Sequence, residues 1–339
     1  MKEKIIIINN EKCVEVNGDI YCENIEMKSL PESLNKYFDI ELILRKSNVN
    51  SVHKIGINKI TISKNILNFI YNIFKSFKNK NTKYLIIAIT PYTFLAYIFL
   101  MFRKKNVFLY LRSNGLDEYR LILGKGFTWI YSLMFYLMSK KSKILCVNEI
   151  IAPGKNYNLV LPSQIDENWF ANVKEPNLKH IKLLYVGRIK IEKGVFSLIN
   201  LFDQLKLDLP CSLTLVGSGK KIKYFSPNIK LVKPISNGTE LKNIYDGHNI
   251  TILPSFTEGH PQVLLESLAR MRPIIIFDEI NFVKKKYNGV FISKRDVSNL
   301  EKTIMYIVKN YKDIYQEMKK NSLPLKEDFT KEMVRILSG

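Results

Sequence analysis

The chain has 339 residues, of which 46% are hydrophobic and 24% are charged. Only 15 residues are Gly and 12 are Pro, so the composition excludes a collagen-like, linker-dominated or disordered chain. With 52 basic and 31 acidic residues, the formal net charge is +21. Such an excess favours anionic partners: nucleic acid, anionic lipid or phosphorylated substrates.

The cysteines and apolar runs indicate a cytoplasmic protein. The four cysteines form no Cys-x-x-Cys pair and no cluster with metal-ligand spacing, so reduced thiols are expected. The first apolar run, in MKEKIIIINN, is too short for a signal peptide. The longest runs, 92–102 and 127–138, fall short of the ~20 residues that a membrane-spanning helix needs.

In the first half of the chain, β-rich runs alternate with segments whose apolar residues recur at helical spacing. Asn17 and Gly18 interrupt an alternating pattern and predict a hairpin at 14–22. Pro91 is expected near the start of a helix. Strands are predicted at 4–10, 39–44, 59–63, 83–90, 106–113, 143–148 and 159–162, and helices at 65–77, 91–102 and 126–141.

The polar stretch 163–180 contains Pro176 and lacks periodicity, which indicates a connection between domains. Beyond it the alternation restarts, and from Lys312 the chain is charged and expected to be helical. Strands are predicted at 181–187, 212–219, 228–234, 249–255, 272–277 and 289–293, and helices at 192–205, 239–247, 261–271 and 297–311.

Apolar strands that alternate with helices indicate parallel sheets covered on both faces. Two such blocks predict an α/β protein with two doubly wound, Rossmann-like domains that face a cleft. The predicted domains are 1–163 and 164–320, and a helical segment, 321–339, could pack back on the first. Ligands of such sheets bind beyond the carboxyl ends of the strands, so the loops after 181–187, 212–219 and 249–255 are expected at one ligand-facing edge.

Two carboxylates mark the stretch TEGHPQVLLE, 257–266. Glu258 is expected in a loop, Pro261 in the first turn of the following helix, and Glu266 inside that helix. A carboxylate accepts two donors and therefore holds vicinal hydroxyls well. Two of them could hold two diols of one extended ligand. The alternative is a capping or solvated Glu258 and a Glu266 that faces water.

Two cations mark the stretch YVGRIKIEKGV, 185–195, where a strand is expected to turn into a helix. Arg188 supplies a planar fork and Lys193 a mobile point charge, a combination that suits a diphosphate. The alternative is that both are ordinary surface bases.

Together these motifs resemble the retaining nucleotide-sugar glycosyltransferases of the GT-B fold, glycosyltransferase family 4 (glycosyl transferases group 1). The likeness rests on VGR-x4-KG, LVGSG and LPS-x2-EG-x2-Q-x3-E and is strong over about 182–277. It is weaker at VLPSQID, 160–166, and YDGHNITILPS, 245–255, which depart from the family's segments. The glycine-rich loop that often follows the first strand of the family is missing.

The resemblance implies roles for the matching residues. Arg188, Lys193 and Glu258 would be catalytic, the cations on the donor diphosphate and Glu258 on the donor sugar. Glu266 would bind the ribose, and His260 is expected to pack or contact the sugar rather than act as a base. No metal or cofactor is expected. The implied donor-binding set is Gly187, Arg188, Lys193, Gly217, Pro234, Ile235, Glu258, Gly259, His260, Pro261, Gln262, Val263 and Glu266.

The acceptor side is less clearly marked. The polar stretch 110–120 offers Arg112, Asn114 and Asp117 as acceptor contacts, with a polar surface loop as the alternative. Residues 101–146 hold nine basic and two acidic residues beside aromatic segments. That combination suits docking on an anionic membrane surface, and core helices with solvated ends are the alternative. No nucleic-acid motif accompanies the charge, so nucleic acid is not expected as a partner.

We therefore expect a glycosyltransferase of the hexosyltransferase type. It would move a sugar from a nucleoside diphosphate sugar to a glycan or lipid-linked acceptor in bacterial surface polysaccharide biosynthesis, such as capsule or lipopolysaccharide. Its expected location is the cytoplasm, peripheral on the inner face of the plasma membrane. The alternative is a non-catalytic sugar-nucleotide-binding or scaffold protein with a degenerate acceptor domain.

Overall fold

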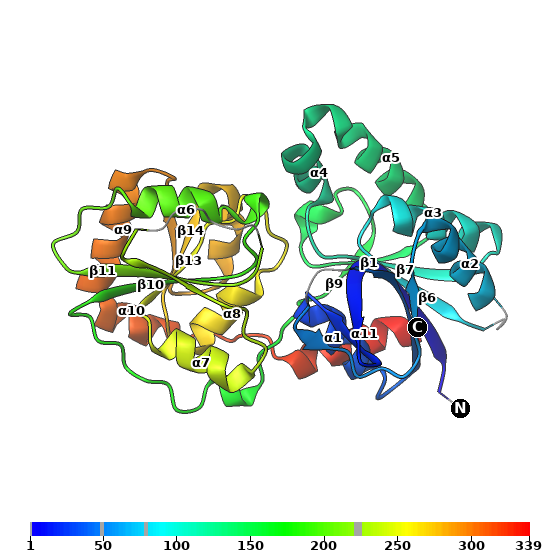
Figure 1. Cartoon of the computed structure of the whole chain (residues 1–339), viewed down its shortest axis with the longest axis horizontal. Coiled ribbons are helices and arrows are strands. Elements are labelled where there is room, and N and C mark those ends of the chain that lie inside the picture. Colours follow the sequence, from blue (N-terminus) through cyan, green and yellow to red (C-terminus); the bar gives the residue numbers. More distant parts are fainter. Residues whose placement is uncertain (1, 48–50, 78–80, 220–225) are drawn as a thin grey trace. The chain divides into compact units, whose positions relative to one another are not determined.

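The computed structural model describes residues 2–47, 51–77, 81–219 and 226–339 and divides into two units. The first unit comprises Met1–Pro162 and Lys326–Gly339, and the second comprises Ser163–Leu325. Each unit has its own hydrophobic core around a largely parallel sheet, with helices packed against the strands (Figure 1). The predicted α/β class with two Rossmann-like domains is confirmed.

The sheet of the first unit contains the strand order β5-β3-β1-β6-β7-β8-β9, in which all neighbours are parallel. Its longest strand, β1, continues past a register shift into an antiparallel hairpin with β2, and the turn at Asn17–Gly18 is as predicted. A short strand, β4, pairs with β2. The strands are β1 (Lys4–Val16), β2 (Asp19–Cys22), β3 (Asp39–Lys46), β4 (His53–Lys54), β5 (Ile60–Ser63), β6 (Lys83–Ile87), β7 (Asn106–Leu111), β8 (Lys143–Cys146) and β9 (Tyr157–Leu159).

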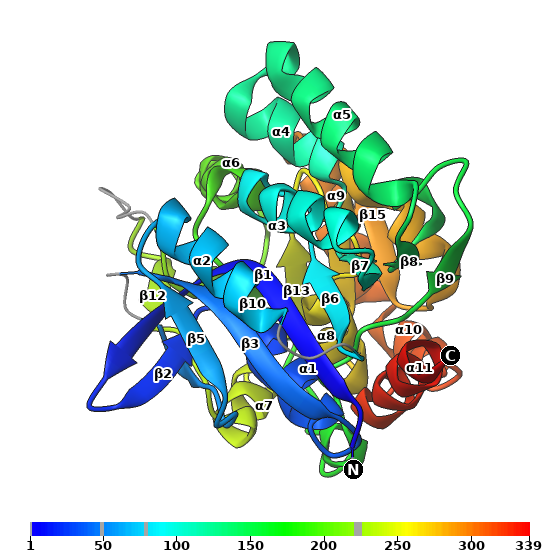
Figure 2. The same ribbon diagram turned by 90° about the vertical axis from the view of Figure 1, so that its right-hand side faces the viewer.

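The helices of the first unit include two that the sequence did not predict, α1 and α4. Helix α1 contains Pro31, a residue that normally ends a helix, and α4 begins within a stretch expected to be a polar loop. In Figure 2, α2 and α3 lie in front of the strands, and α1 contacts α11. The helices are α1 (Ile25–Leu34), α2 (Ile66–Ser76), α3 (Pro91–Phe102), α4 (Gly115–Leu123), α5 (Thr128–Ser139) and α11 (Lys326–Ser338), with short turns η1 (Lys125–Phe127) and η2 (Glu149–Ile151).

The sheet of the second unit is fully parallel, in the order β12-β11-β10-β13-β14-β15. The order reverses between β10 and β13, which makes the carboxyl ends of these two strands the expected ligand site. Figure 1 shows α6 on one side of this sheet and α7 and α8 on the other. The strands are β10 (Ile181–Val186), β11 (Cys211–Val216), β12 (Ile229–Val232), β13 (Ile250–Leu253), β14 (Ile274–Phe277) and β15 (Val290–Ser293).

The remaining elements of the second unit are helices and helical turns, and most follow the predicted boundaries. The exceptions are η3 and η5, which the sequence did not predict. The elements are η3 (Glu167–Trp169), η4 (Ile191–Lys193), α6 (Val195–Phe202), α7 (Gly238–Asp246), α8 (Gln262–Ala269), η5 (Asp278–Lys286), α9 (Val297–Lys309) and α10 (Tyr311–Met318).

Candidate functional site in the second unit

Three loops meet at the carboxyl edge of the second sheet, after β10, β11 and β13. The backbone N–H of Ile189 donates to the carbonyl of Ser218 at 2.7 Å, which joins the first two loops. The N–H of Phe256 donates to the carbonyl of Glu192 at 3.0 Å, which joins the first loop to the third. These bonds fix the loops beside the point where the strand order reverses.

Two glycines let these loops approach so closely. A Cβ on Gly217 would lie 1.8 Å from the carbonyl oxygen of Gly187, and one on Gly194 would lie 1.9 Å from that of Pro254. Gly194 also has a positive φ of 64°, which L side chains rarely adopt. No side chain fits at either position. Loop packing alone therefore requires glycine at 217, the position that the sequence analysis assigned to donor binding.

The loops bring Lys193 and Glu258 into direct contact. The Nζ of Lys193 lies 2.6 Å from the Oε1 of Glu258, and the hydroxyl of Ser255 donates to the same oxygen at 2.6 Å. The side chains of Lys193 and Glu258 are 21% and 10% exposed, so the pair is mostly shielded from water. The carboxylate is therefore held at the end of β13 by a cation that comes from the loop after β10.

Arg188 lies in the same loop and is half-buried. Its carbonyl accepts a hydrogen bond from the hydroxyl of Tyr185 at 2.6 Å. Within the ranges that the structure describes, which leave out 220–225, its guanidinium makes no ion pair or hydrogen bond. A planar cation at this edge is suited to binding two oxygens of an anionic ligand.

Glu266 lies in α8 and is bound to α7 rather than to the cations. The hydroxyl of Tyr245 donates to its Oε2 at 2.8 Å, and Glu266 is only 7% exposed. Burial raises the pKa of Glu266 to about 7, although the hydrogen bond from Tyr245 acts in the opposite direction. This carboxyl group therefore changes its charge near neutral pH.

The other predicted donor residues surround these contacts. Pro261 caps α8 instead of lying in its first turn, and the helix begins at Gln262, followed by Val263. Gly259 and Pro261 are buried, whereas His260 is half-buried. Pro234 and Ile235 follow β12, and Ile235 also packs against the core of the unit.

The predicted acceptor residues lie in the first unit, and two of them have a local structural role. Asn114 caps α4, and its amide donates to the carboxylate of Asp117 at 2.6 Å. Arg112 instead pairs with Glu26 of α1 at 2.8 Å, and the hydroxyl of Tyr110 donates to the same carboxylate at 2.8 Å. The sequence analysis missed Glu26, because it precedes Arg112 by 86 positions and lies in an unpredicted helix.

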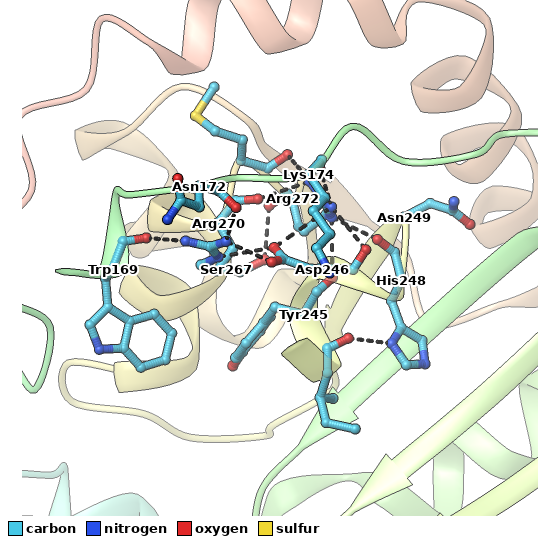
Figure 3. A network of polar contacts seen from close by, with 12 residues as sticks. Trp169, Asn172, Lys174, Tyr245, Asp246, His248, Asn249, Ser267, Arg270 and Arg272 are labelled. Atoms are coloured by element: carbon cyan, nitrogen blue, oxygen red, sulfur yellow. Dashed lines mark hydrogen bonds and ion pairs between the residues drawn. The ribbon is translucent and has the colours of Figure 1, made fainter. Parts of the chain in front are cut away.

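The sequence analysis also missed two buried arginines that follow α8 and bind the end of α7, shown in Figure 3. Arg270 binds Asp246 with its Nε at 3.0 Å and its Nη2 at 2.6 Å, and it donates to the carbonyls of Trp169 and Ala171 at 2.7 and 2.8 Å. Arg272 is fully buried and donates to the backbone carbonyls of Tyr245, His248, Arg270, Asp246 and Lys174, and its Nη2 lies 3.9 Å from the carboxylate of Asp246.

This network holds the connection that opens the second unit. Its carbonyl acceptors at Trp169, Ala171, Asn172 and Lys174 all belong to that connection. A polar pocket of about 670 Å³ lies beside it, between the connection and α7.

Three further properties of the described residues bear on partners. The ranges that the structure covers contain no group of three or more His, Cys, Asp or Glu residues placed to hold a metal ion. In the same ranges, every helix is too short or too polar to cross a membrane. The four cysteines are free thiols, and Cys13, Cys22 and Cys146 are buried.

Residues 166–323 match the family model described as Glycosyl transferases group 1. The matched segment lies inside the second unit and contains Arg188, Lys193, Glu258 and Glu266. The match covers nearly the whole second unit, as expected for the glycosyl transferases group 1 domain predicted there from the sequence.

Individual proteins agree with this assignment. The chain is 27% identical over 193 residues to an uncharacterized glycosyltransferase of Haemophilus influenzae, a match that covers 54% of this chain and 52% of that protein. The chain spans about half the length of the curated relatives it matches.

Two solved structures are similar over nearly the whole chain. The Anabaena protein Alr3699/HepE, in complex with UDP and glucose, has a TM-score of 0.68 at 12% identity and covers 99% of this chain and 100% of its own. WaaG, a glycosyltransferase involved in lipopolysaccharide biosynthesis, has a TM-score of 0.62 at 12% identity. That match covers 98% of this chain and 100% of the WaaG chain. The expected GT-B architecture is therefore confirmed at the level of the fold.

Proposed function

We propose that the protein is a retaining glycosyltransferase of family 4 that uses a nucleoside diphosphate sugar and needs no metal. Its acceptor is a glycan or a lipid-linked glycan of a bacterial surface polysaccharide, and it works at the inner face of the plasma membrane. The observation that carries the proposal is the Lys193–Glu258 pair, with the half-buried Arg188 in the same loop as Lys193, at the strand-order reversal of a unit that matches the glycosyl transferases group 1 model.

Each residue has a distinct role in the proposed transfer. Arg188 and Lys193 bind the diphosphate and stabilise the negative charge that it gains as its bond to the sugar C1 breaks. Glu258 accepts hydrogen bonds from the sugar hydroxyls, and Glu266 from the ribose. The acceptor oxygen bonds to C1 on the face that the diphosphate leaves, and the acceptor proton passes to the departing phosphate oxygen.

A thermal-shift screen of nucleoside diphosphate sugars tests the proposal directly. A ligand that binds only the folded state raises the unfolding temperature by mass action, and the donor that gives the largest shift is then assayed for hydrolysis and transfer. Binding without either reaction would favour the scaffold alternative. If none of the nucleoside diphosphate sugars shifts the unfolding temperature, the proposed donor-binding site is contradicted.

The two carboxylates should separate binding from turnover. We expect Glu266→Ala to weaken nucleoside diphosphate binding about tenfold or more, because hydrogen bonds to a charged group are lost. Glu258→Ala should lower turnover more than it lowers nucleotide affinity. Calorimetry and a donor-hydrolysis assay measure the two effects, with Glu240→Ala on the exposed face of α7 as the control. Equal effects of all three changes would contradict the assigned roles.

Nucleotide binding should depend on pH through Glu266. Ribose hydroxyls donate to the ionised carboxylate, so binding requires loss of the proton that the carboxyl group holds below about pH 7. We expect the affinity to fall about tenfold between pH 8 and pH 6.

The raised pKa of Glu266 also affects stability. Because the folded-state pKa lies above the ordinary value of 4.5, the unliganded protein should lose free energy of unfolding as the pH rises from 4.5 through 7.

Glu266→Gln provides the control, because it removes this titration and leaves that of the nucleotide phosphates unchanged. Calorimetric titrations at both pH values should give a smaller pH dependence for the variant. If the nucleotide affinity of Glu266→Gln depended on pH as strongly as that of the unaltered protein, the titrating group would be a residue other than Glu266.

A further inference from the structure

Helix α5 of the first unit presents an apolar row to solvent. Its core-facing residues include Tyr131, Met134 and Met138, as expected for a helix that packs on one side. The opposite side is also apolar, at helical spacing. Its exposed residues are Trp129 at 64%, Leu133 at 48%, Tyr136 at 50% and Leu137 at 36%.

The preceding segment extends this row. Residues 120–127, from the end of α4 through η1, are all exposed. The apolar side chains among them are Leu121, Ile122, Leu123 and Phe127, exposed by 42%, 63%, 50% and 50%. We call the exposed apolar residues of 121–137 the hairpin face. A water-soluble surface rarely gathers so many large apolar side chains in one contiguous stretch.

The hairpin face lies on a well-packed support. Gly115 of α4 lies against the ring of Tyr131, where a Cβ would come within 2.1 Å of the ring. The rings of Tyr119 and Tyr131 are 5.4 Å apart, and Tyr131 stacks with Phe135. Figures 1 and 2 both show α4 and α5 side by side and extending away from the strands of their own unit. The apolar residues are thus held outward by helix packing rather than left by a loose loop.

The charge around the hairpin face is mainly positive, although α4 also carries Glu118 and Asp117, which pairs with Arg120 at 3.2 Å. No acidic residue occurs from 119 to 148, whereas five bases do: Arg120, Lys125, Lys140, Lys141 and Lys143. Arg120 lies in α4, Lys125 lies between α4 and α5, and Lys140, Lys141 and Lys143 follow α5. The Nζ of Lys140 lies 4.1 Å from the centre of the Tyr136 ring, at the end of the apolar row. Long basic side chains of this kind can reach anionic headgroups while their neighbours enter the acyl region.

We propose that the hairpin face docks on an anionic lipid bilayer, with Trp129, Leu133 and Ile122 entering the interface. Helix α5, with 12 residues, is about 18 Å long, so it lies in the plane of the interface and does not span it. The inference uses a surface remote in sequence from the donor-binding residues. It stands on the exposed side chains and their charge, whether or not the transferase proposal holds.

Vesicle binding with the full chain tests this inference. The protein should sediment with phosphatidylcholine vesicles that contain phosphatidylglycerol and not with phosphatidylcholine alone, and added salt should weaken binding. Trp129 reports insertion directly, because its exposed indole should shift to shorter emission wavelengths on the anionic vesicles. The other tryptophan, Trp169, is buried in the second unit. Trp129→Phe should abolish the shift and retain sedimentation.

Matched substitutions by Glu test whether vesicle binding depends on the hairpin face. Trp129→Glu and Leu133→Glu should each weaken vesicle binding at least about tenfold, because a carboxylate must then be brought to an anionic interface. Tyr306→Glu, at a 56% exposed position on α9, should bind like the unaltered protein. Nucleoside diphosphate binding should be the same in all three, which separates loss of docking from failure of the donor site.

Two results would overturn the inference. One is equal vesicle binding by Trp129→Glu and Tyr306→Glu. The other is a lipid-free dimer that Trp129→Glu dissociates, since the hairpin face would then be covered by a second copy of the chain.

Discussion

Arg188→Ala should reduce turnover of the nucleoside diphosphate sugar by about 10²- to 10³-fold, the effect of removing one well-placed electrostatic contact to a transition state. Arg188 is half-buried, and the described part of the chain gives its guanidinium no internal partner, so its loss should leave the fold intact. The effect should fall mainly on the rate, because charge on the leaving diphosphate grows as its bond to the sugar breaks.

Two variants make this result interpretable. Arg188→Lys should lie between Ala and the unaltered protein, since it keeps the charge but loses the planar fork. Lys230→Ala removes one positive charge from an exposed position on β12 and should leave turnover unchanged. Steady-state kinetics with the donor found by thermal shift would measure all three. Equal turnover by Arg188→Ala and Lys230→Ala would contradict a role for Arg188 in the proposed transfer.

Arg270→Leu should lower the free energy of unfolding of the second unit by about 3–5 kcal/mol, the usual cost of leaving one member of a buried ion pair alone. Arg270 and Asp246 are 3% and 4% exposed at their side chains, and the two groups meet at 2.6 Å. The carbonyls of Trp169, Ala171 and Asn172 would lose a charged donor as well. The connection should therefore detach from α7 and α8 before the sheet unfolds.

Urea unfolding followed by tryptophan emission would measure this change. Trp169 is buried beside the network, whereas Trp129 is already exposed, so most of the emission change should report the second unit. Lys320→Ala, which breaks an ion pair whose side chains are 66% and 54% exposed, should cost less than about 1 kcal/mol. A common unfolding midpoint for the two variants would show that Arg270 does not hold the connection.

The apolar strands and the spacing of the motifs were sufficient to predict most of the fold. The runs around Ile5–Ile8 and Ile274–Phe277 form fully buried strands, as runs of this kind do in parallel sheets. The segment from Gly187 to Lys193 and the stretch around Glu258 were expected at one edge, and the Lys193–Glu258 contact brings them together. Local pattern and parallel topology were enough, because both segments begin where a strand ends.

The remaining features depend on partners that lie far apart in the sequence or carry no side-chain signal. Arg272 is fixed by backbone carbonyls, which every residue type offers, so no motif marks it. Glu26 and Arg112 meet only after β7 and α1 have assembled. The helix that follows Asn114 was missed because its capping side chains look like those of a polar loop.

The return of α11 to the first unit affects the order in which a ribosome can complete the two cores. Phe329, Met333 and Leu337 belong to the first core, yet they are translated after every residue of Ser163–Leu325. The second core can therefore close while the first still exposes the apolar surface that these side chains will cover. The first core is thus begun first and completed last during synthesis, because Lys326–Gly339 supplies its final apolar side chains.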